Sequence, residues 1–275
     1  SGGARQSSGA SDEALQLDEP RGRTFGSGAL SVMRTLRGWL FYAAFAVTMV
    51  PVALVILLTA PVKDAAWRYD AVVRPWLGFV MKLLKFFCGI TYEVTGAENI
   101  PQDGRSVVVL SKHSSAWETL FLPYFVPHCM GFVYKESLHR IPFFGWALKS
   151  MGMIAINRQK GVTAYASFLR RGREFLKSGW WVILFPEGTR VAWKTQKPYK
   201  TGGARFAAAT GAWVLPVAHD AGRLWPRNTV AKTPGVIHVV FGPLIKTEGE
   251  TFQTIHQATQ SWIEGEVARM VEADA

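Results

Sequence analysis

Two short segments of the sequence carry side chains whose types and spacing suit proton transfer and anion binding. The first is KHSSAWE at residues 112–118, in which Glu118 follows His113 by five positions. Imidazole has an ordinary pKa of about 6.5 and is therefore a suitable general base at neutral pH. A carboxylate one helical turn further on can accept a hydrogen bond from the far ring nitrogen. The pair predicts a general base whose tautomer is fixed and whose imidazolium form is stabilised.

The second segment is FPEGTR at residues 185–190, which follows a very apolar run. Pro186 fixes its own φ and Gly188 permits a tight turn, so that backbone donors can converge on an oxyanion. Arg190 has the planar guanidinium that suits bidentate contact with a phosphate. We expect Glu187 either to accept a hydrogen bond from a substrate hydroxyl or to position Arg190.

Two other interpretations of the first segment remain open. Ser115 and Glu118 fit the capping box S-x-x-E, in which the glutamate supports the start of a helix. Ser114 or Ser115 is an alternative covalent nucleophile, although the chain has no G-x-S-x-G elbow to present one.

The elements that must position these residues follow from the pattern after residue 92. Short β-rich runs alternate with longer helical ones, which indicates an α/β domain over residues 93–275 with a mixed, largely parallel sheet flanked by helices. His113 then lies at the carboxyl end of a strand, where open α/β sheets place their ligands. The expected strands are residues 90–95, 106–110, 131–134, 153–156, 180–185, 213–217 and 236–241, and the expected helices are 116–125, 143–150, 163–177, 203–210 and 251–272.

An apolar run precedes this domain and predicts a membrane anchor. Residues 39–59 contain no charged side chain, and about 20 such residues can enter or cross a bilayer. A cleaved signal peptide is the rival, but the run is longer than a typical signal core and no clear A-x-A site follows it. Pro51 inside the run can mark a kink.

The charges around the run suggest how the anchor lies. Basic residues stand on both sides, which favours two cytoplasmic flanks. Residues 76–90 are apolar but contain Lys82 and Lys85, as expected of an amphipathic helix in the interface. We therefore expect residues 33–92 to form a shallow or re-entrant helical pair in the inner (cytoplasmic) membrane, with the catalytic domain on the cytoplasmic face.

The composition and net charge of the chain indicate which classes of partner it can bind. Residues 1–32 are rich in Ser, Gly, Ala and Arg, and we expect a disordered extension there. The net charge of +11 suits membrane phospholipids or a polyanionic substrate. No zinc-finger or RNP-like pattern supports a nucleic acid partner. Cys88 and Cys129 form no C-x-x-C motif, which argues against a disulfide scaffold or a zinc-thiolate site.

Taken together, residues 110–243 resemble the 1-acylglycerol-3-phosphate acyltransferase family, of the bacterial lysophosphatidic acid acyltransferase type. The first motif of that family is H-x4-D, and here Glu118 replaces the aspartate. Glutamate is one methylene longer but keeps the charge and the acceptor function. The resemblance implies the glycerolipid acyltransferase fold with an N-terminal membrane-associated helical pair.

The resemblance also implies roles for individual residues. His113 is the general base and Glu118 the orienting carboxylate. The second motif matches residues 152–158, where Arg158 contacts the phosphate of the acceptor, and Lys135 is a weaker candidate of the same kind. The remaining substrate-binding residues come from the third motif and from the apolar-proline-apolar fourth motif: Glu187, Gly188, Thr189, Arg190 and Pro216.

The implied reaction moves an acyl chain from acyl-CoA or acyl carrier protein to the sn-2 hydroxyl of lysophosphatidic acid, giving phosphatidic acid. We expect no metal and no bound cofactor. Another acceptor, such as glycerol-3-phosphate or a lyso-ornithine lipid, is an alternative, as is a non-catalytic membrane lipid-binding module. A basic cluster is suited to donor phosphates or lipid head groups, and equally to a solvated face: Lys194, Lys197, Lys200 and Arg205.

Overall fold

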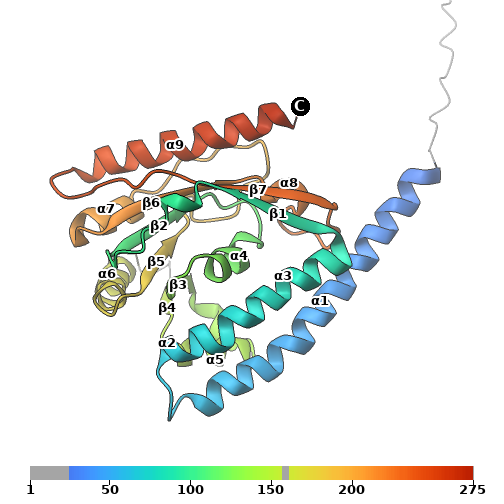
Figure 1. The fold of residues 1–275 in the computed structure, drawn as a ribbon, viewed down its shortest axis with the longest axis horizontal. Helices are drawn as coiled ribbons and strands as arrows, with labels where there is room; N and C mark the ends of the chain where they lie inside the picture. The colour runs from blue at the N-terminus through green and yellow to red at the C-terminus, as the bar shows by residue number, and fades with distance from the viewer. Residues whose placement is uncertain (1–24, 157–160, 275) are drawn as a thin grey trace, which may run out of the picture.

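The computed structural model describes residues 25–156 and 161–274. Its N-terminal part is helical, and two long helices lie side by side at one edge of the molecule (Figure 1). Four helical elements make up this part: α1 (Phe25–Thr59), α2 (Ala65–Arg68), the π-helical turn η1 (Tyr69–Val73) and α3 (Arg74–Cys88).

The rest of the described chain is a sheet of seven strands with helices on both faces, in the order β1-β7-β6-β2-β5-β3-β4. Every neighbouring pair is parallel except β6 and β7. The strands are β1 (Ile90–Thr95), β2 (Val107–Ser111), β3 (Met130–Lys135), β4 (Ile154–Ile156), β5 (Trp181–Leu184), β6 (Trp213–His219) and β7 (Gly235–Phe241). The helical elements are η2 (Ala97–Asn99), α4 (Glu118–Phe125), η3 (Glu136–Arg140), α5 (Phe144–Ser150), α6 (Gly161–Lys177), α7 (Gly202–Thr210), α8 (Ala221–Leu224) and α9 (Phe252–Ala273).

The central strand β2 is buried on both faces, because helices cover the sheet on each side. Val107 and Val109 belong to the core shared with α1, α3 and α4, whereas Val108 and Leu110 belong to the core beneath α6, α7 and α9. Successive side chains of a strand point to opposite faces, so an unbroken apolar run is what such a position requires. Figure 1 shows α9 along one side of the sheet and α3 with α1 on the other.

The sequence-based expectation of a mixed, largely parallel sheet is confirmed. All seven expected strands are present among the described residues, with ends within two residues of those expected. The antiparallel β6–β7 pair is the feature that makes the sheet mixed.

The N-terminal helices differ from the expectation in two ways. Residues 25–32, expected to be disordered, form the first turns of α1, because no proline separates them from the apolar run and elongation of a formed helix is cheap. Residues 1–24 lie outside the described part. Before α3 the helix widens to a π turn, in which the Arg74 amide donates to the Tyr69 carbonyl; Pro75 cannot donate to its own i−4 carbonyl, which is a recognised cause of such turns.

Arg68 ties the turn between α1 and α3 to α5. It is 5% exposed, and Nη1 donates to the Ile56 carbonyl at 3.3 Å and to Ser150 Oγ at 2.6 Å. Nη2 donates to the Ser150 carbonyl at 3.2 Å. The N-terminal helices and the α/β domain are therefore one packed unit.

We expect Arg68→Ala to lower the free energy of unfolding by about 1–3 kcal/mol, because buried acceptors lose their donors. Thermal unfolding of the detergent-solubilised protein measures this. Arg170→Ala is the control, since Arg170 is 68% exposed and its pair with Glu174 contributes little. Equal unfolding temperatures for the two variants would contradict the role of Arg68.

Candidate active site

The segment 112–117 follows β2 and leads into α4, so His113 stands at the carboxyl end of a central strand, as predicted. Neighbouring strands hold its backbone. The Lys112 amide donates to the Val217 carbonyl at 2.9 Å, and the Val191 amide donates to the His113 carbonyl at 2.7 Å. His219 Nε2 donates to the Lys112 carbonyl at 2.9 Å. The catalytic candidate is therefore fixed at its backbone on both sides.

His113 and Glu118 form a hydrogen-bonded pair. Nδ1 of His113 lies 2.8 Å from Oε1 of Glu118. Because an ionised carboxylate only accepts, Nδ1 carries the proton, and Nε2 is the ring nitrogen left to act as a base. The longer glutamate side chain thus reaches the imidazole.

The same carboxylate oxygen also accepts from the amides of Ser114 and Ser115, each at 3.0 Å. The bond to Ser115 resembles one half of the capping box that the sequence suggested. Helix α4, however, begins at Glu118 with Trp117 at its N-cap, two residues after the expected start. Glu118 therefore closes the turn before the helix while the same oxygen binds the imidazole.

Glu118 is fully buried, and its charge is nevertheless stabilised. Burial alone would raise the pKa of this carboxyl, but the neighbouring His219 and His113 and the Ser115 amide outweigh burial and lower the pKa. Oε2 lies 3.9 Å from Nε2 of His219 and has no hydrogen-bond partner within the described part of the chain. Glu118 therefore remains the acceptor that His113 requires.

The hydroxyl groups of both serines are engaged in holding the loop. Ser114 Oγ accepts from the Gly222 amide at 3.1 Å. Ser115 Oγ donates to the Trp225 carbonyl at 2.8 Å and accepts from the Trp117 amide at 3.2 Å. Both serines are at most 1% exposed. This placement disfavours the alternative in which either serine attacks the substrate.

The FPEGTR segment lies directly beside this loop. The Phe185 ring stacks on the His113 imidazole with centroids 4.1 Å apart, a contact that sequence reasoning missed. Gly188 has φ of 68°, so the turn needs the conformational freedom of glycine. Thr189 is exposed and Arg190 is half-buried.

Glu187 is placed differently from the expectation. Its side chain is 0% exposed, and Oε1 accepts from the His113 amide at 3.2 Å and lies 3.3 Å from Nζ of Lys112. It therefore faces the catalytic loop and not a substrate hydroxyl. The clue in the sequence was Lys112, because a lysine at the end of a buried strand requires a buried carboxylate.

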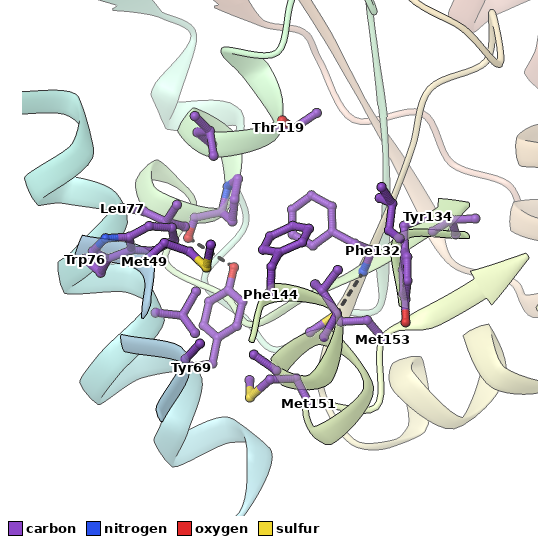
Figure 2. A pocket seen from close by; sticks show the side chains of 18 of the residues that line it. Met49, Tyr69, Trp76, Leu77, Thr119, Phe132, Tyr134, Phe144, Met151 and Met153 are labelled. Carbon is purple, nitrogen blue, oxygen red and sulfur yellow. Dashed lines mark hydrogen bonds between the residues drawn. The ribbon is translucent and has the colours of Figure 1, made fainter. Parts of the chain in front are cut away.

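An apolar cavity of about 420 Å³ begins at this site (Figure 2). His113, Phe185, Gly188 and Lys135 line one part of it. In the view of Figure 2, Thr119 lies above the other labelled lining residues, and Tyr69 and Met151 lie low in the picture. Much of the wall comes from the N-terminal helices, through Phe45, Met49, Val52, Ala53, Ile56, Tyr69, Val73, Trp76 and Leu77.

The other predicted binding residues are dispersed. Lys135 ends β3 and is exposed at the cavity wall. Pro216 lies in β6 and packs beside Gly242; it is not among the residues that line the described cavity. Arg158 lies outside the described residues. From the basic cluster, Lys200 comes close to the site, since a Cβ added at Gly188 would be 3.1 Å from its Nζ.

Comparison with known proteins agrees with this geometry. The family model described as Acyltransferase matches residues 91–220. The chain is 38% identical over 245 residues to the 1-acyl-sn-glycerol-3-phosphate acyltransferase of Pseudomonas aeruginosa, covering 88% of this chain and 94% of that protein. The enzyme of the same name from Borreliella burgdorferi is 30% identical over 175 residues, covering 62% and 69%.

The fold also has a solved counterpart. The crystal structure of the 1-acyl-sn-glycerophosphate (LPA) acyltransferase PlsC from Thermotoga maritima matches with a TM-score of 0.72 at 24% identity, covering 88% of this chain and 97% of that one. The identity and coverage shared with the Pseudomonas protein show that this chain belongs to the acyltransferase family that includes the bacterial 1-acyl-sn-glycerol-3-phosphate acyltransferases.

Proposed function

We propose that this chain transfers an acyl group from an acyl thioester to the sn-2 hydroxyl of 1-acyl-sn-glycerol-3-phosphate, giving phosphatidic acid. One observation carries the proposal: His113 lines an apolar cavity while its Nδ1 is held by a buried carboxylate, so that Nε2 is available at the cavity wall. The names of the Pseudomonas and Borreliella relatives support this acceptor.

The reaction follows from this geometry. Nε2 of His113 takes the proton of the sn-2 hydroxyl as the oxygen attacks the thioester carbonyl. Glu118 stabilises the imidazolium that forms. The tetrahedral intermediate collapses, the carbon–sulfur bond breaks, and the imidazolium returns its proton to the departing thiolate. The products are phosphatidic acid and the free thiol of coenzyme A or of the acyl carrier protein.

The cavity binds the acyl chain of the donor. Its volume of about 420 Å³ lies within the range of about 300–1,000 Å³ that is common for small-molecule sites, and its wall is mainly aliphatic and aromatic. Since the thioester carbonyl must lie at His113, a chain extending from that carbonyl enters the cavity, whose wall includes Tyr69 and Met151.

The acceptor phosphate binds close to His113, near Gly188 and the cavity wall. Lys135 lines the cavity wall and Lys200 lies beside Gly188, so both bring positive charge to this region. Arg190, two residues after Gly188, and Arg158 are proposed to join them by the family pattern. A guanidinium binds phosphate through two parallel hydrogen bonds, which makes Arg190 the principal contact.

The exposed apolar surface of α1 and α3 supports the proposal that the protein binds to a membrane. Residues 28–59 form one helix that is long and apolar enough to cross a bilayer, within the described part of the chain. Val47, Leu58 and Phe86 are 71–75% exposed, which water alone does not favour. We place these helices in the inner membrane, among its phospholipids, with the α/β domain on the cytoplasmic face.

We expect His113→Ala to lower kcat for phosphatidic acid formation by about a hundredfold or more, because general-base catalysis is lost. The assay follows conversion of 1-acylglycerol-3-phosphate with an acyl thioester in matched membranes. His256→Ala, on α9, is the control and should retain wild-type activity. A His113→Ala enzyme as active as wild type would refute the mechanism, and an inactive wild type would refute the acceptor.

Shortening a side chain of the cavity wall should change which acyl chains are used. We expect Met151→Ala to shift the preference toward longer donors, because each additional buried methylene contributes about 0.8 kcal/mol. The measurement is kcat/KM over a series of acyl-CoA lengths. Met33→Ala, 54% exposed on α1, is the matched control. An unchanged length profile in Met151→Ala would place the acyl chain elsewhere.

Charges on the exposed apolar surface should release the protein from membranes. We expect the triple substitution Val47→Asp, Leu58→Asp, Phe86→Asp to move the protein to the soluble fraction, since a charged side chain within the apolar layer costs about 2.5–3.5 kcal/mol. Placing aspartate at the exposed Gln253, Gln257 and Ala258 of α9 changes the net charge equally. If both triple variants fractionate alike, α1 and α3 are not the membrane surface.

A further inference from the structure

A cluster of buried charges lies beneath the catalytic loop and extends to the C-terminal helix. Lys112, the residue before His113, is 2% exposed, and its Nζ lies 2.7 Å from Oε1 of Glu264 on α9. The same Nζ lies 3.3 Å from Oε1 of Glu187. Glu264 is outside residues 91–220, which match the family model, and it belongs to none of the motifs discussed above.

The contacts form a continuous path to the backbone of the catalytic residue. Oε1 of Glu187, which pairs with Lys112, also accepts from the His113 amide at 3.2 Å. At the other end, Oε1 of Glu264 accepts from the Tyr199 hydroxyl at 2.7 Å. One ammonium group thus joins two carboxylates, one from the loop after β5 and one from α9.

The cluster leaves two buried acceptor atoms without a donor among the described residues. Oε2 of Glu187 and Oε2 of Glu264 are both buried, and neither has a hydrogen-bond partner within the described ranges. Burial raises the pKa of Glu187 against the opposing effect of Lys112. Burial and the two carboxylates raise the pKa of Tyr199, so its phenol stays a donor. Removing one member therefore forces the others to rearrange, since a buried charge without its partner is costly.

We propose that Glu264 is a positioning residue for His113, acting through Lys112 and Glu187. Glu264 makes the shorter contact with Lys112 and holds its ammonium away from full engagement with Glu187. Without the contact to Glu264, Nζ of Lys112 moves toward Glu187. Oε1 of Glu187 then moves away from the His113 amide. The imidazole then shifts relative to the thioester, although no side chain that lines the cavity has been substituted. This inference rests on the proposed acyl transfer.

The experiment measures kcat, KM and amide hydrogen exchange in the full-length, detergent-solubilised protein. We expect Glu264→Gln to lower kcat by roughly 10- to 100-fold, because small misplacements of a reacting group are costly, while KM for both substrates stays unchanged. The exchange of the peptide containing His113 should be faster. Glu266→Gln is the matched control: it lies on the same helix, its side chain is 14% exposed, and its partner is Arg269.

A double-mutant cycle tests the route through Lys112. If Glu264 acts only through Lys112, the double variant Lys112→Met/Glu264→Gln should lose no more kcat than Lys112→Met alone. If the losses of kcat in the two single variants add in the double variant, Glu264 does not act through Lys112. A folded Glu264→Gln enzyme with wild-type kcat, or one changed only in KM, would overturn the positioning role.

The exchange measurement separates this proposal from the proposed function. If the wild type does not acylate lysophosphatidate, the proposed function fails, yet faster exchange at His113 in Glu264→Gln and not in Glu266→Gln still supports the link between α9 and the loop. Unchanged exchange in Glu264→Gln overturns the link whatever the acceptor is.

Discussion

The charge of Glu118, placed where water does not reach it, is the constraint on which the site depends. A buried carboxylate is tolerated only when donors surround it, and this one receives hydrogen bonds from the His113 ring and from the amides of Ser114 and Ser115. Those donors exist because the chain turns from β2 into α4 at this point. The turn therefore fixes the orientation of the imidazole, and the imidazole in turn helps to keep the carboxylate ionised.

The turn itself depends on elements that are far away in the sequence. The parallel neighbours of β2 bring Val217 and the loop after β5 to the same edge of the sheet, where they bind the backbone on both sides of His113. On the other face, α9 supplies Glu264 to Lys112. Because several independent elements hold the backbone of His113, it resists displacement better than a backbone held by one contact. Preorganised catalysis requires such a fixed position.

Much of this arrangement was predictable from sequence, for identifiable reasons. The strands were found because Val107–Ser111 and its neighbours are short apolar runs bounded by turn residues, and the His113–Glu118 pair because both partners lie within one local turn. Glu187 was misplaced because its motif is shared with phosphate-binding residues, whereas its environment is decided by Lys112. Glu264 carries no local signal at all, since its partner is 152 residues away in the chain.

The cavity connects α1 with the catalytic loop. Phe45, Met49 and Ile56 turn one side of α1 into cavity wall, while Val47 and Leu58 leave another side exposed. A helix that is apolar on both sides would be unfavourable in water, but it is consistent with acyl chains on one side and lipid on the other. The apolar N-terminal segment therefore also forms cavity wall, and removing it would open the cavity. In the proposed function, substrate binding and membrane attachment are therefore carried by two sides of one helix, α1.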